Sequence, residues 1–304
     1  MGKRSFIRVC DRDINVQGRL IRIARPEADE FVFIENPEMV INSLRESETR
    51  ADLFTFVQRL SECSPKYAYP LEWDNFAAMS VSTFDHWLAH QAHYSVRTKV
   101  RKAEKKGLEV REVPFDDVLV RGIWEIYNEC PVRQGRPFHH YGKDLETVRK
   151  MTATFLDRSI FIGTYFGGSL IGFVKLVIDP TGELASTMHV ISQIRHRDKA
   201  PTNALIAQLV RSCADRGISR LVYGKFAYGS KRGDSLSDFK EYSGFRRIDV
   251  PRYYIPLTLI GRLALRMGLH HCLVDYCPEP VVAKFRELRS GWYNHKIRSV
   301  APSS

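Results

Sequence analysis

Residues 194–223, IRHRDKAPTNALIAQLVRSCADRGISRLVY, follow the strand-like run ELASTMHVIS at 183–192 and decide the fold. A helix is predicted here from apolar residues that recur every three or four positions, namely Ala204, Leu205, Leu209, Val210 and Ala214. Gly217 ends it. The order is therefore strand, basic loop, helix, strand. Because the first N–H groups of a helix lack partners within it and its dipole is positive there, we expect a phosphate site at the helix start.

The composition is that of a folded protein with an excess of positive charge. The 304 residues are 44% hydrophobic and 27% charged, which excludes a disordered chain. The formal net charge of +11 favours polyanionic partners such as nucleic acid, anionic lipid or a phosphate-rich cofactor. Six scattered cysteines indicate free thiols in a reducing compartment. With no signal-peptide pattern and no uncharged stretch of about 18 residues, we expect a cytoplasmic protein.

The rest of the chain predicts a mixture of strands and helices. Alternating residues predict strands within 5–35, and a helix is predicted at 52–63. A basic helical pattern from Phe84 ends at Gly107, before a strand at 108–113. Two helices at 118–130 and 145–158 precede an antiparallel meander over 159–192. After the segment 194–223 come a short helix at 237–245, a strand at 246–257 and a basic helical tail.

This order of elements over residues 114–256 resembles the GNAT superfamily of acyltransferases. The resemblance implies an α/β fold with a mixed sheet. In most GNAT enzymes the donor loop reads Gln/Arg-x-x-Gly-x-Gly/Ala, because the donor pyrophosphate approaches the backbone closely. The corresponding residues 197–202, Arg-Asp-Lys-Ala-Pro-Thr, lack both glycines, and Pro201 removes one N–H donor. The loop therefore argues against a tight cradle for the pyrophosphate of coenzyme A.

The departure resembles the FemABX peptidyltransferases and their FemAB-like relatives. Three features carry this resemblance: the loop with Pro201, a basic helix that ends in Lys106-Gly107, and the segment Phe239-Lys240 followed by Gly244-Phe245. It implies a reduced N-terminal GNAT-like region at 1–113 that ends in the basic helix. A GNAT acyltransferase domain would follow at 114–256, and a basic helical tail at 257–304.

The resemblance implies transfer of an acyl or aminoacyl group from an activated donor to an amine. The donor would be a co-substrate, either aminoacyl-tRNA, acyl-CoA or acyl-carrier protein, with no permanently bound cofactor. Lys240 stands where many GNAT enzymes have a tyrosine that protonates the leaving thiolate, and a lysine suits a tRNA 3′ hydroxyl as leaving group. His189, on the strand before the donor loop, is the candidate proton acceptor. A solvated Lys240 and a structural His189 are the alternatives.

The expected donor-binding residues surround the helix start and the strand after it. They are Arg197, Lys199, Thr202, Asn203, Tyr223, Lys225 and Phe239. Tyr223 and Lys225 lie on the strand where GNAT sheets splay apart to admit the acyl chain. Packing within the sheet is the alternative for Tyr223.

The basic helix is a candidate polyanion-binding surface. Its six cations are Arg97, Lys99, Arg101, Lys102, Lys105 and Lys106. They could follow the phosphates of tRNA, although a solvated face would have the same composition. DNA is not an expected partner. The tail helix, with Arg262 and Arg266 among apolar residues, suits either packing on its own domain or peripheral contact with the inner face of a membrane.

Two histidine pairs resemble metal ligands at first sight. Neither His139-His140 nor His270-His271-Cys272 with Cys277 has a four-ligand zinc spacing, so no metal is expected. Two other functions stay open. One is an N-acyltransferase that uses coenzyme A or an acyl carrier, and the other is a non-catalytic GNAT fold that binds RNA or membrane.

Overall fold

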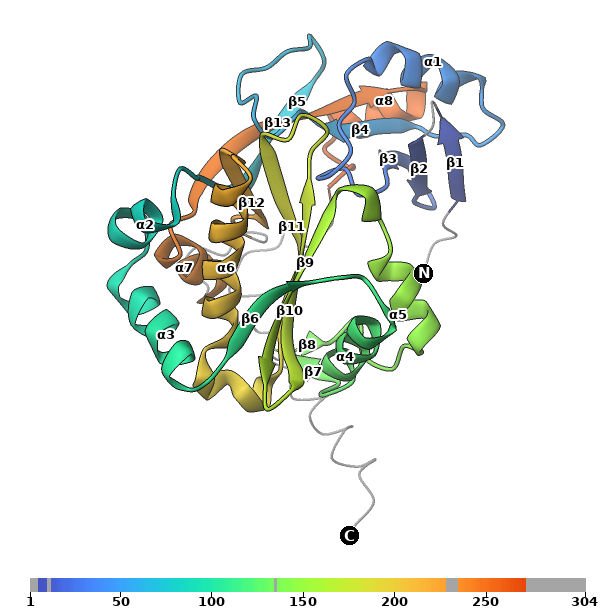
Figure 1. Ribbon diagram of the computed structural model, residues 1–304. Helices are drawn as coiled ribbons and strands as arrows, with labels where there is room; N and C mark the ends of the chain where they lie inside the picture. Colours follow the sequence, from blue (N-terminus) through green and yellow to red (C-terminus); the bar gives the residue numbers. More distant parts are fainter. Residues whose placement is uncertain (1–4, 10–11, 134–135, 228–234, 272–304) are drawn as a thin grey trace. The chain divides into compact units, whose positions relative to one another are not determined.

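The computed structural model describes residues 5–9, 12–133, 136–227 and 235–271 (Figure 1). Contacts divide the chain into two compact units. Unit 1 comprises Met1–Ala78, Gly224–Gly229 and Arg246–Tyr276; unit 2 comprises Met79–Tyr223, Ser230–Phe245 and Cys277–Ser304. The units interleave in the sequence. Residues 79–113, which the sequence analysis grouped with the N-terminal region, are in unit 2, and the domain boundaries at 113 and 257 stay predictions.

Unit 1 contains six strands in the order β1-β2-β3-β4-β13-β5. Their bounds are β1 Ser5–Val9, β2 Arg12–Gln17, β3 Ile23–Pro26, β4 Leu53–Val57, β13 Arg246–Pro256 and β5 Leu71–Ser80. Neighbouring strands are antiparallel except for the parallel pair β3 and β4. Strand β13 pairs with β4 on one edge and with β5 on the other, so it joins segments about 170 to 200 residues earlier in the chain.

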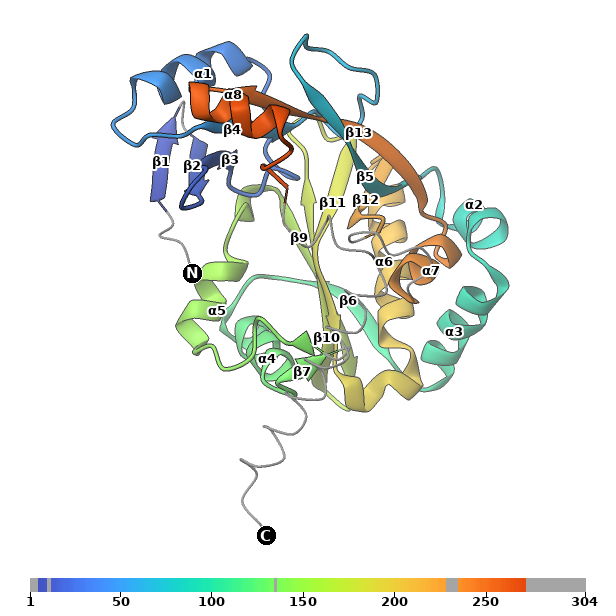
Figure 2. The ribbon, with the colours of Figure 1, turned by 180° about the vertical axis from the view of Figure 1, so that it is seen from behind.

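Two helices complete unit 1. Helix α1 (Pro37–Glu46) starts at Asn36, whose side chain accepts a hydrogen bond from the Met39 amide, and its buried side chains join the core beside β1 and β2 (Figure 2). Helix α8 (Leu259–Arg266) starts at Thr258, which caps the Gly261 amide and donates to Asp52 at 2.8 Å. Gly261 lies against the Asp52 carbonyl so closely that an added Cβ would be 1.8 Å from its oxygen.

The predicted helix at 52–63 is wrong, because its first half is strand β4. All five residues of β4 are buried, so its apolar character is continuous and shows no alternation. A short, fully buried strand and a helix cannot be told apart by apolar periodicity. The strand predicted at 31–35 is also absent, and α1, just after it, was not predicted.

A buried charge network lies in unit 1. Arg252, 6% exposed, donates to Asp74 at 2.6 Å and to Asp29 at 2.8 Å. Lys225 also pairs with Asp74, and its Nζ lies 4.3 Å from the centroid of the Phe76 ring. Burial raises the pKa of Asp74, but Arg252 and Lys225 outweigh this and hold it below its ordinary value. Asp74 is therefore ionised and neutralised by its partners.

The larger sheet of unit 2 contains the strands β12-β11-β10-β9-β6 in that order. Their bounds are β12 Arg220–Lys225, β11 Leu184–Ser192, β10 Ser169–Ile178, β9 Ser159–Phe166 and β6 Glu109–Val113. The predicted meander is confirmed as β9, β10 and β11, with a turn at Gly167-Gly168, where both residues have positive φ. Strands β11 and β12 are parallel, and their pairing ends at Ser186 and Val222.

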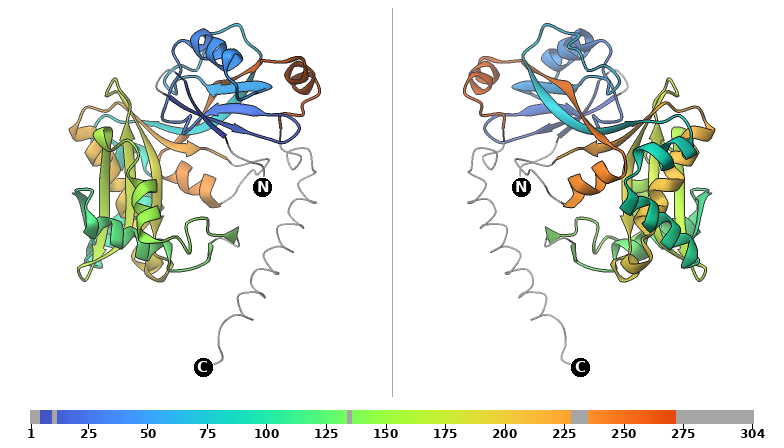
Figure 3. Two further views of the ribbon diagram at one scale, coloured as in Figure 1. Left: turned by 90° about the vertical axis from the view of Figure 1, so that its right-hand side faces the viewer. Right: turned by 90° about the vertical axis from the view of Figure 1, so that its left-hand side faces the viewer.

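Helices lie on both faces of this sheet (Figure 3). Helix α6 (Pro201–Asp215) packs on β9, β10 and β11, and α3 (Tyr94–Lys105) packs on α6. On the other face, α4 (Asp117–Tyr127) and α5 (Leu145–Thr152) pack together, and α4 covers β10. Successive residues of β10 point to these two faces in turn. Gly172 faces Leu205 of α6, whereas Phe173 joins the core under α4. Helix α7 (Ser235–Tyr242) is a further helix among the described residues of the unit.

The basic helical pattern from Phe84 is interrupted. It forms α2 (Phe84–His86), the π-helical turn η1 (Trp87–Gln91) and then α3, which His93 caps by accepting a hydrogen bond from the Ser95 amide. Gly107, with φ 76°, ends α3 as predicted. A small hairpin of β7 (Val132–Arg133) and β8 (Arg136–Pro137) follows α4, and short 3₁₀ turns precede β9 (η2, Leu156–Arg158) and α6 (η3, Ile194–Lys199).

The structure tests two further expectations only in part, because some of their residues lie outside the described ranges. The tail helix is confirmed as α8, while residues 272–304 lie outside the described residues. Cys63, Cys130 and Cys213 are free thiols, and the other three cysteines also lie outside. Within the described ranges, no helix has the length and apolar character that crossing a membrane requires.

Candidate functional site

The first turn of α6 has a backbone donor without a described partner. The helix begins after Ala200, which has the left-handed conformation (φ 57°, ψ 44°) and no side chain that could cap. The amides of Asn203 and Ala204 both donate to the Ala200 carbonyl, and Pro201 has no N–H. Within the described contacts, the Thr202 amide is left as the first-turn donor. The Thr202 hydroxyl bonds to that of Ser192 at 2.8 Å, which fixes the helix start to the end of β11.

Asn203 adds a buried donor at the same place. It is 6% exposed, and its Nδ2 is buried with no hydrogen-bond partner among the described residues. A buried amide without a partner costs about 1–3 kcal/mol. An oxygen of a bound ligand would remove this cost. The predicted donor residues Thr202 and Asn203 therefore lie together at the helix start.

A carboxylate of the chain itself holds the first amides of the donor loop. Glu129, just after α4, accepts hydrogen bonds from the amides of Ile194 at 2.7 Å and Arg195 at 3.0 Å. It also pairs with Arg133 at 3.1 Å. An anionic pyrophosphate approaching these amides would meet this negative charge. No sequence pattern pointed to Glu129, because an acid after a helix is ordinary and its partners come 65 residues later.

The basic side chains of the loop differ in exposure. Arg197 is exposed, whereas the side chain of Lys199 is 17% exposed, pairs with Asp198 at 3.3 Å and lies 4.8 Å from the centroid of the Phe166 ring. Desolvation raises the pKa of Asp198, but the hydrogen bond from Lys199 and the charges of Lys199 and Lys106 leave it below its ordinary value. Lys106, from the end of the basic helix, is thus near the loop.

The basic helix α3 borders the donor loop within unit 2. It buries Val96, Val100 and Ala103 and contacts η3 as well as α6 (Figure 1). Arg97 is half-buried and donates to the carbonyls of Leu88 and Ala89, within η1. The other five cations are exposed, namely Lys99, Arg101, Lys102, Lys105 and Lys106. Together with the cations of η3 they form a basic strip, which we define as these five residues with Arg195, Arg197 and Lys199.

Lys240 is buried on α7. It is 1% exposed, so it is not the solvated helix residue of the alternative interpretation. Its Nζ lies 4.9 Å from the centroid of the Tyr223 ring, which contacts Phe245 at 5.6 Å and Phe239 at 6.4 Å. Tyr223 and Phe239 are half-buried, whereas Phe245 is buried. Tyr223 follows Val222 on β12, where the pairing with β11 ends. Three predicted residues, Lys240, Tyr223 and Phe239, are thus brought together.

His189 lies in a separate cluster under α4. Its ring is 5.6 Å from that of His140, 6.1 Å from Phe173 and 6.4 Å from Tyr127, and Tyr127 stacks on His140 at 4.3 Å. Burial, with help from His140 and Lys175, lowers the pKa of His189 to about 3. Burial, with His139, Lys143 and Arg133, lowers that of His140 to about 4. Both imidazoles are neutral at pH 7.

The Tyr127 cluster, defined as Tyr127, His140 and His189, has unmet hydrogen-bonding positions. Among the described residues, the Tyr127 hydroxyl and the His140 Nδ1 are buried without a partner. The sequence pointed to His189 alone, because the other two reach it from α4 and from the loop before α5. No described contact joins this cluster to Lys240. Lys225, also predicted for the donor, is grouped with unit 1 and pairs there with Asp74.

Comparison with known proteins identifies the fold. No protein-family model matches the sequence, and no curated protein sequence does. Among solved structures, FemX superposes with a TM-score of 0.59 at 10% identity, over 87% of this chain and 90% of that chain. L-PGS from Bacillus licheniformis gives 0.58 at 14% identity, over 86% and 88%. The C-terminal domain of a protein described as a lysylphosphatidylglycerol synthetase, from Agrobacterium fabrum, gives 0.56 at 13%, over 87% and 88%. The chain has the FemAB-related, GNAT-like α/β fold that its sequence predicts.

Proposed function

We propose that the chain is an acyltransferase that moves an aminoacyl group from aminoacyl-tRNA to an amine. The observation that carries the proposal is the basic strip, in which four exposed cations of α3 and Lys106 at its C-cap belong to a helix that contacts η3, directly before α6. The fold is compatible with this chemistry. By its name, one structural neighbour makes lysylphosphatidylglycerol, a lipid that carries an aminoacyl group.

The donor loop favours tRNA over coenzyme A. A pyrophosphate cradle needs several free amides, but Glu129 occupies those of Ile194 and Arg195, and Pro201 has none. A polynucleotide can instead be held by long cationic side chains that neutralise several phosphates. The Thr202 amide and Asn203 Nδ2 would then receive a single phosphate or ribose oxygen at the acceptor end.

Lys240 and His189 have complementary proposed roles. The amine nitrogen attacks the ester carbonyl carbon, the C–N bond forms and the bond to the tRNA 3′ oxygen breaks. The amine loses a proton and the 3′ oxygen gains one. The ammonium of Lys240 would stabilise the developing negative charge on oxygen. His189, with its low pKa, would remain neutral and accept a hydrogen bond from the amine, which aligns the nitrogen lone pair.

A transfer assay tests the proposal. The full-length protein is incubated with total tRNA charged with labelled amino acids and with a panel of peptide amines. The expected product is an alkali-stable amide, whereas unreacted aminoacyl ester is hydrolysed by base. Lys240→Ala should lower kcat at least about 100-fold with little change in KM, since its interaction belongs to the transition state. Lys150→Ala, at an exposed lysine of α5, is the control and should retain kcat.

Separate arms address the alternatives. Transfer from acyl-CoA without tRNA would overturn the choice of donor, and an alkali-labile product in phosphatidylglycerol vesicles would overturn the amine acceptor. If no donor gave transfer while tRNA binding was retained, the chain would be a non-catalytic RNA-binding protein.

The basic strip makes tRNA affinity depend on salt. Each phosphate neutralised contributes about 0.7 to 0.9 to the slope of log affinity against log salt. Replacing Lys105 and Lys106 by Gln should flatten this slope by about 1.5, measured by filter binding. The matched variant Arg121→Gln/Lys150→Gln removes the same charge from exposed positions of α4 and α5 and should leave the slope unchanged. Equal slopes in the two double variants would leave α3 as a solvated face.

A further inference from the structure

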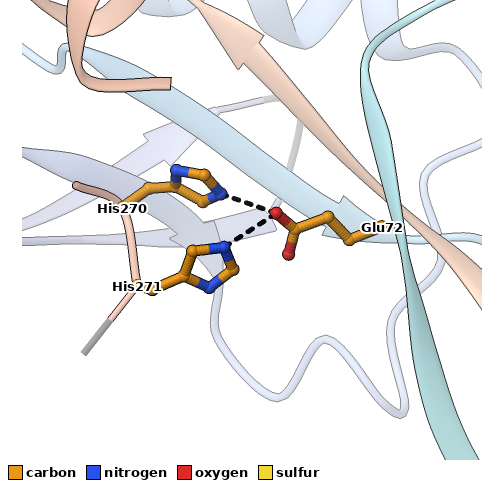
Figure 4. Close-up of side chains that lie close together, drawn as sticks. All are labelled: Glu72, His270 and His271. Carbon is orange, nitrogen blue, oxygen red and sulfur yellow. Dashed lines mark hydrogen bonds and ion pairs between the residues drawn. The ribbon is translucent and has the colours of Figure 1, made fainter. Parts of the chain in front are cut away.

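Unit 1 brings two histidines and a carboxylate to one point. Glu72 is on β5, and His270 and His271 follow α8 (Figure 4). The Nε2 atoms of His270 and His271 lie 2.8 and 2.9 Å from the same oxygen, Glu72 Oε1. The three ligand atoms are all within 4.8 Å of one another. From this convergence we infer a binding site for a divalent transition-metal ion of the zinc type.

The ligand set and its spacing suit zinc. Imidazole nitrogen and carboxylate oxygen bind Zn²⁺ at about 2.0–2.2 Å, and three such protein ligands leave a position open in tetrahedral geometry. Ligand atoms around such an ion are about 3.3 Å apart. Separations of 2.8 and 2.9 Å therefore need to widen by only about 0.4–0.5 Å. Two imidazoles and one carboxylate are also a ligand set that selects Zn²⁺, Fe²⁺ or Ni²⁺ over Mg²⁺ and Ca²⁺.

The described ion pairs of the cations near Glu72 are with other carboxylates. Arg252, opposite Glu72 on β13, donates to Asp29 and Asp74. Asp74, on the same face of β5, is occupied by Arg252 and Lys225. The strong cations nearby are thus engaged with other acids, and an ion bound at Glu72 would meet a carboxylate that they leave available.

One ligand is fixed by packing and the other two reach solvent. The His270 side chain is 3% exposed, and its ring lies edge-on to Tyr254 at 4.6 Å. The side chains of His271 and Glu72 are 33% and 38% exposed, which gives an ion a path of entry. A bound ion would join the segment after α8 to β5. The site would therefore be a structural metal site that holds these two segments together. It does not depend on the proposed transfer reaction.

Zinc titration of the full chain tests the site. After removal of metal with a chelator, calorimetry with ZnCl₂ should show one ion per chain, and thermal unfolding should shift upward with zinc. Glu72→Gln keeps the size of the side chain, and His271→Ala changes a partly exposed residue, so both variants should fold. Each should weaken zinc binding at least about tenfold and remove the thermal shift.

Two matched variants test whether zinc binds to histidines elsewhere or to thiols. His86→Ala/His90→Ala removes an exposed pair whose rings are 4.9 Å apart without a carboxylate, and it should bind zinc like the parent chain. Cys272→Ser/Cys277→Ser should also retain the ion. Parental affinity in Glu72→Gln and His271→Ala would overturn the inference. Loss of zinc in the cysteine variant alone would overturn it too, because the thiols would then be the ligands.

Discussion

Two buried polar side chains belong to the proposed site. Lys240 is 1% exposed on α7, and Asn203 is 6% exposed at the start of α6. Burying an amine or an amide is unfavourable unless its hydrogen-bonding and electrostatic needs are met. Lys240 lies over the Tyr223 ring, while the Asn203 amide has an unmet donor. Such costs are typical of positions where binding compensates for lost stability.

The Tyr127 cluster makes stability depend on pH in a defined window. The pKa values of about 3 for His189 and about 4 for His140 lie below the value near 6.5 of an unfolded histidine. As the pH falls below 6.5, the unfolded chain takes up protons that the folded chain does not. The stability contributed by the neutral pair is therefore complete above pH 6.5 and is lost as the pH falls, to about pH 4 for His140 and about pH 3 for His189.

Urea unfolding at a series of pH values measures this loss, which should reach about 1.4 kcal/mol per pH unit for each proton. His189→Phe and His140→Phe should each flatten the dependence. His86→Phe, at an exposed position, should not. An NMR titration in which His189 protonates near pH 6 would contradict the prediction.

Lys240 and Asn203 were proposed from the sequence because they stand at fixed positions in segments that resemble a family, and their roles stay predictions. Glu129 and Glu72 were not proposed, because their partners are 65 and about 200 residues away in sequence and only the fold brings them together. The expectation of no metal stays a prediction, and it rested on a spacing rule that considers only ligands close together in the chain.

At the scale of elements, residues that mark turns and helix ends identified elements that are mostly buried, such as β10 and α6. The meander and α6 were predicted because they combine clear patterns with glycine turns. Strand β4 was mistaken for a helix because both of its faces are buried. The helix predicted from Phe84 lacked the observed break before α3. The capping residue there is His93, and because histidine also occurs within helices, the sequence did not mark a new helix start.

Helix α8 provides an element-scale prediction. A Cβ at Gly261 would lie 1.8 Å from the Asp52 carbonyl oxygen, so Gly261→Ala forces the helix away from its place. Overpacking of this kind costs about 1–3 kcal/mol. The free energy of urea unfolding should fall by that amount, and zinc affinity should fall with it, because His270 and His271 follow α8 directly.

Leu259→Ala is the control on the same helix, where the side chain is 78% exposed. It should change the free energy of unfolding by less than about 0.5 kcal/mol. If Gly261→Ala had the stability of the parent chain, the close contact of α8 with Asp52 would be wrong.

At the scale of the whole molecule, unit 1 is completed by β13, a strand far along the chain from the strands that it pairs with. Strand β13 pairs with β4 from Arg252 to Pro256 and with β5 from Arg246 to Tyr253. It also supplies buried Tyr253 and Arg252, which satisfy Gln58, Asp29 and Asp74. The sequence suggested an N-terminal region at 1–113 because strand patterns there are local, whereas a pairing across about 170 residues leaves no local signal.

A fragment of residues 1–113 should therefore not fold on its own. It would contain β4 and β5 without the strand that lies between them, so each would have an unpaired edge and Asp74 would lose Arg252. Residues 1–276 contain all of unit 1 and should fold cooperatively. Urea unfolding followed by circular dichroism, with trypsin resistance as a second measurement, compares the two. A cooperative transition in the 1–113 fragment would show that the N-terminal segment forms its core without β13.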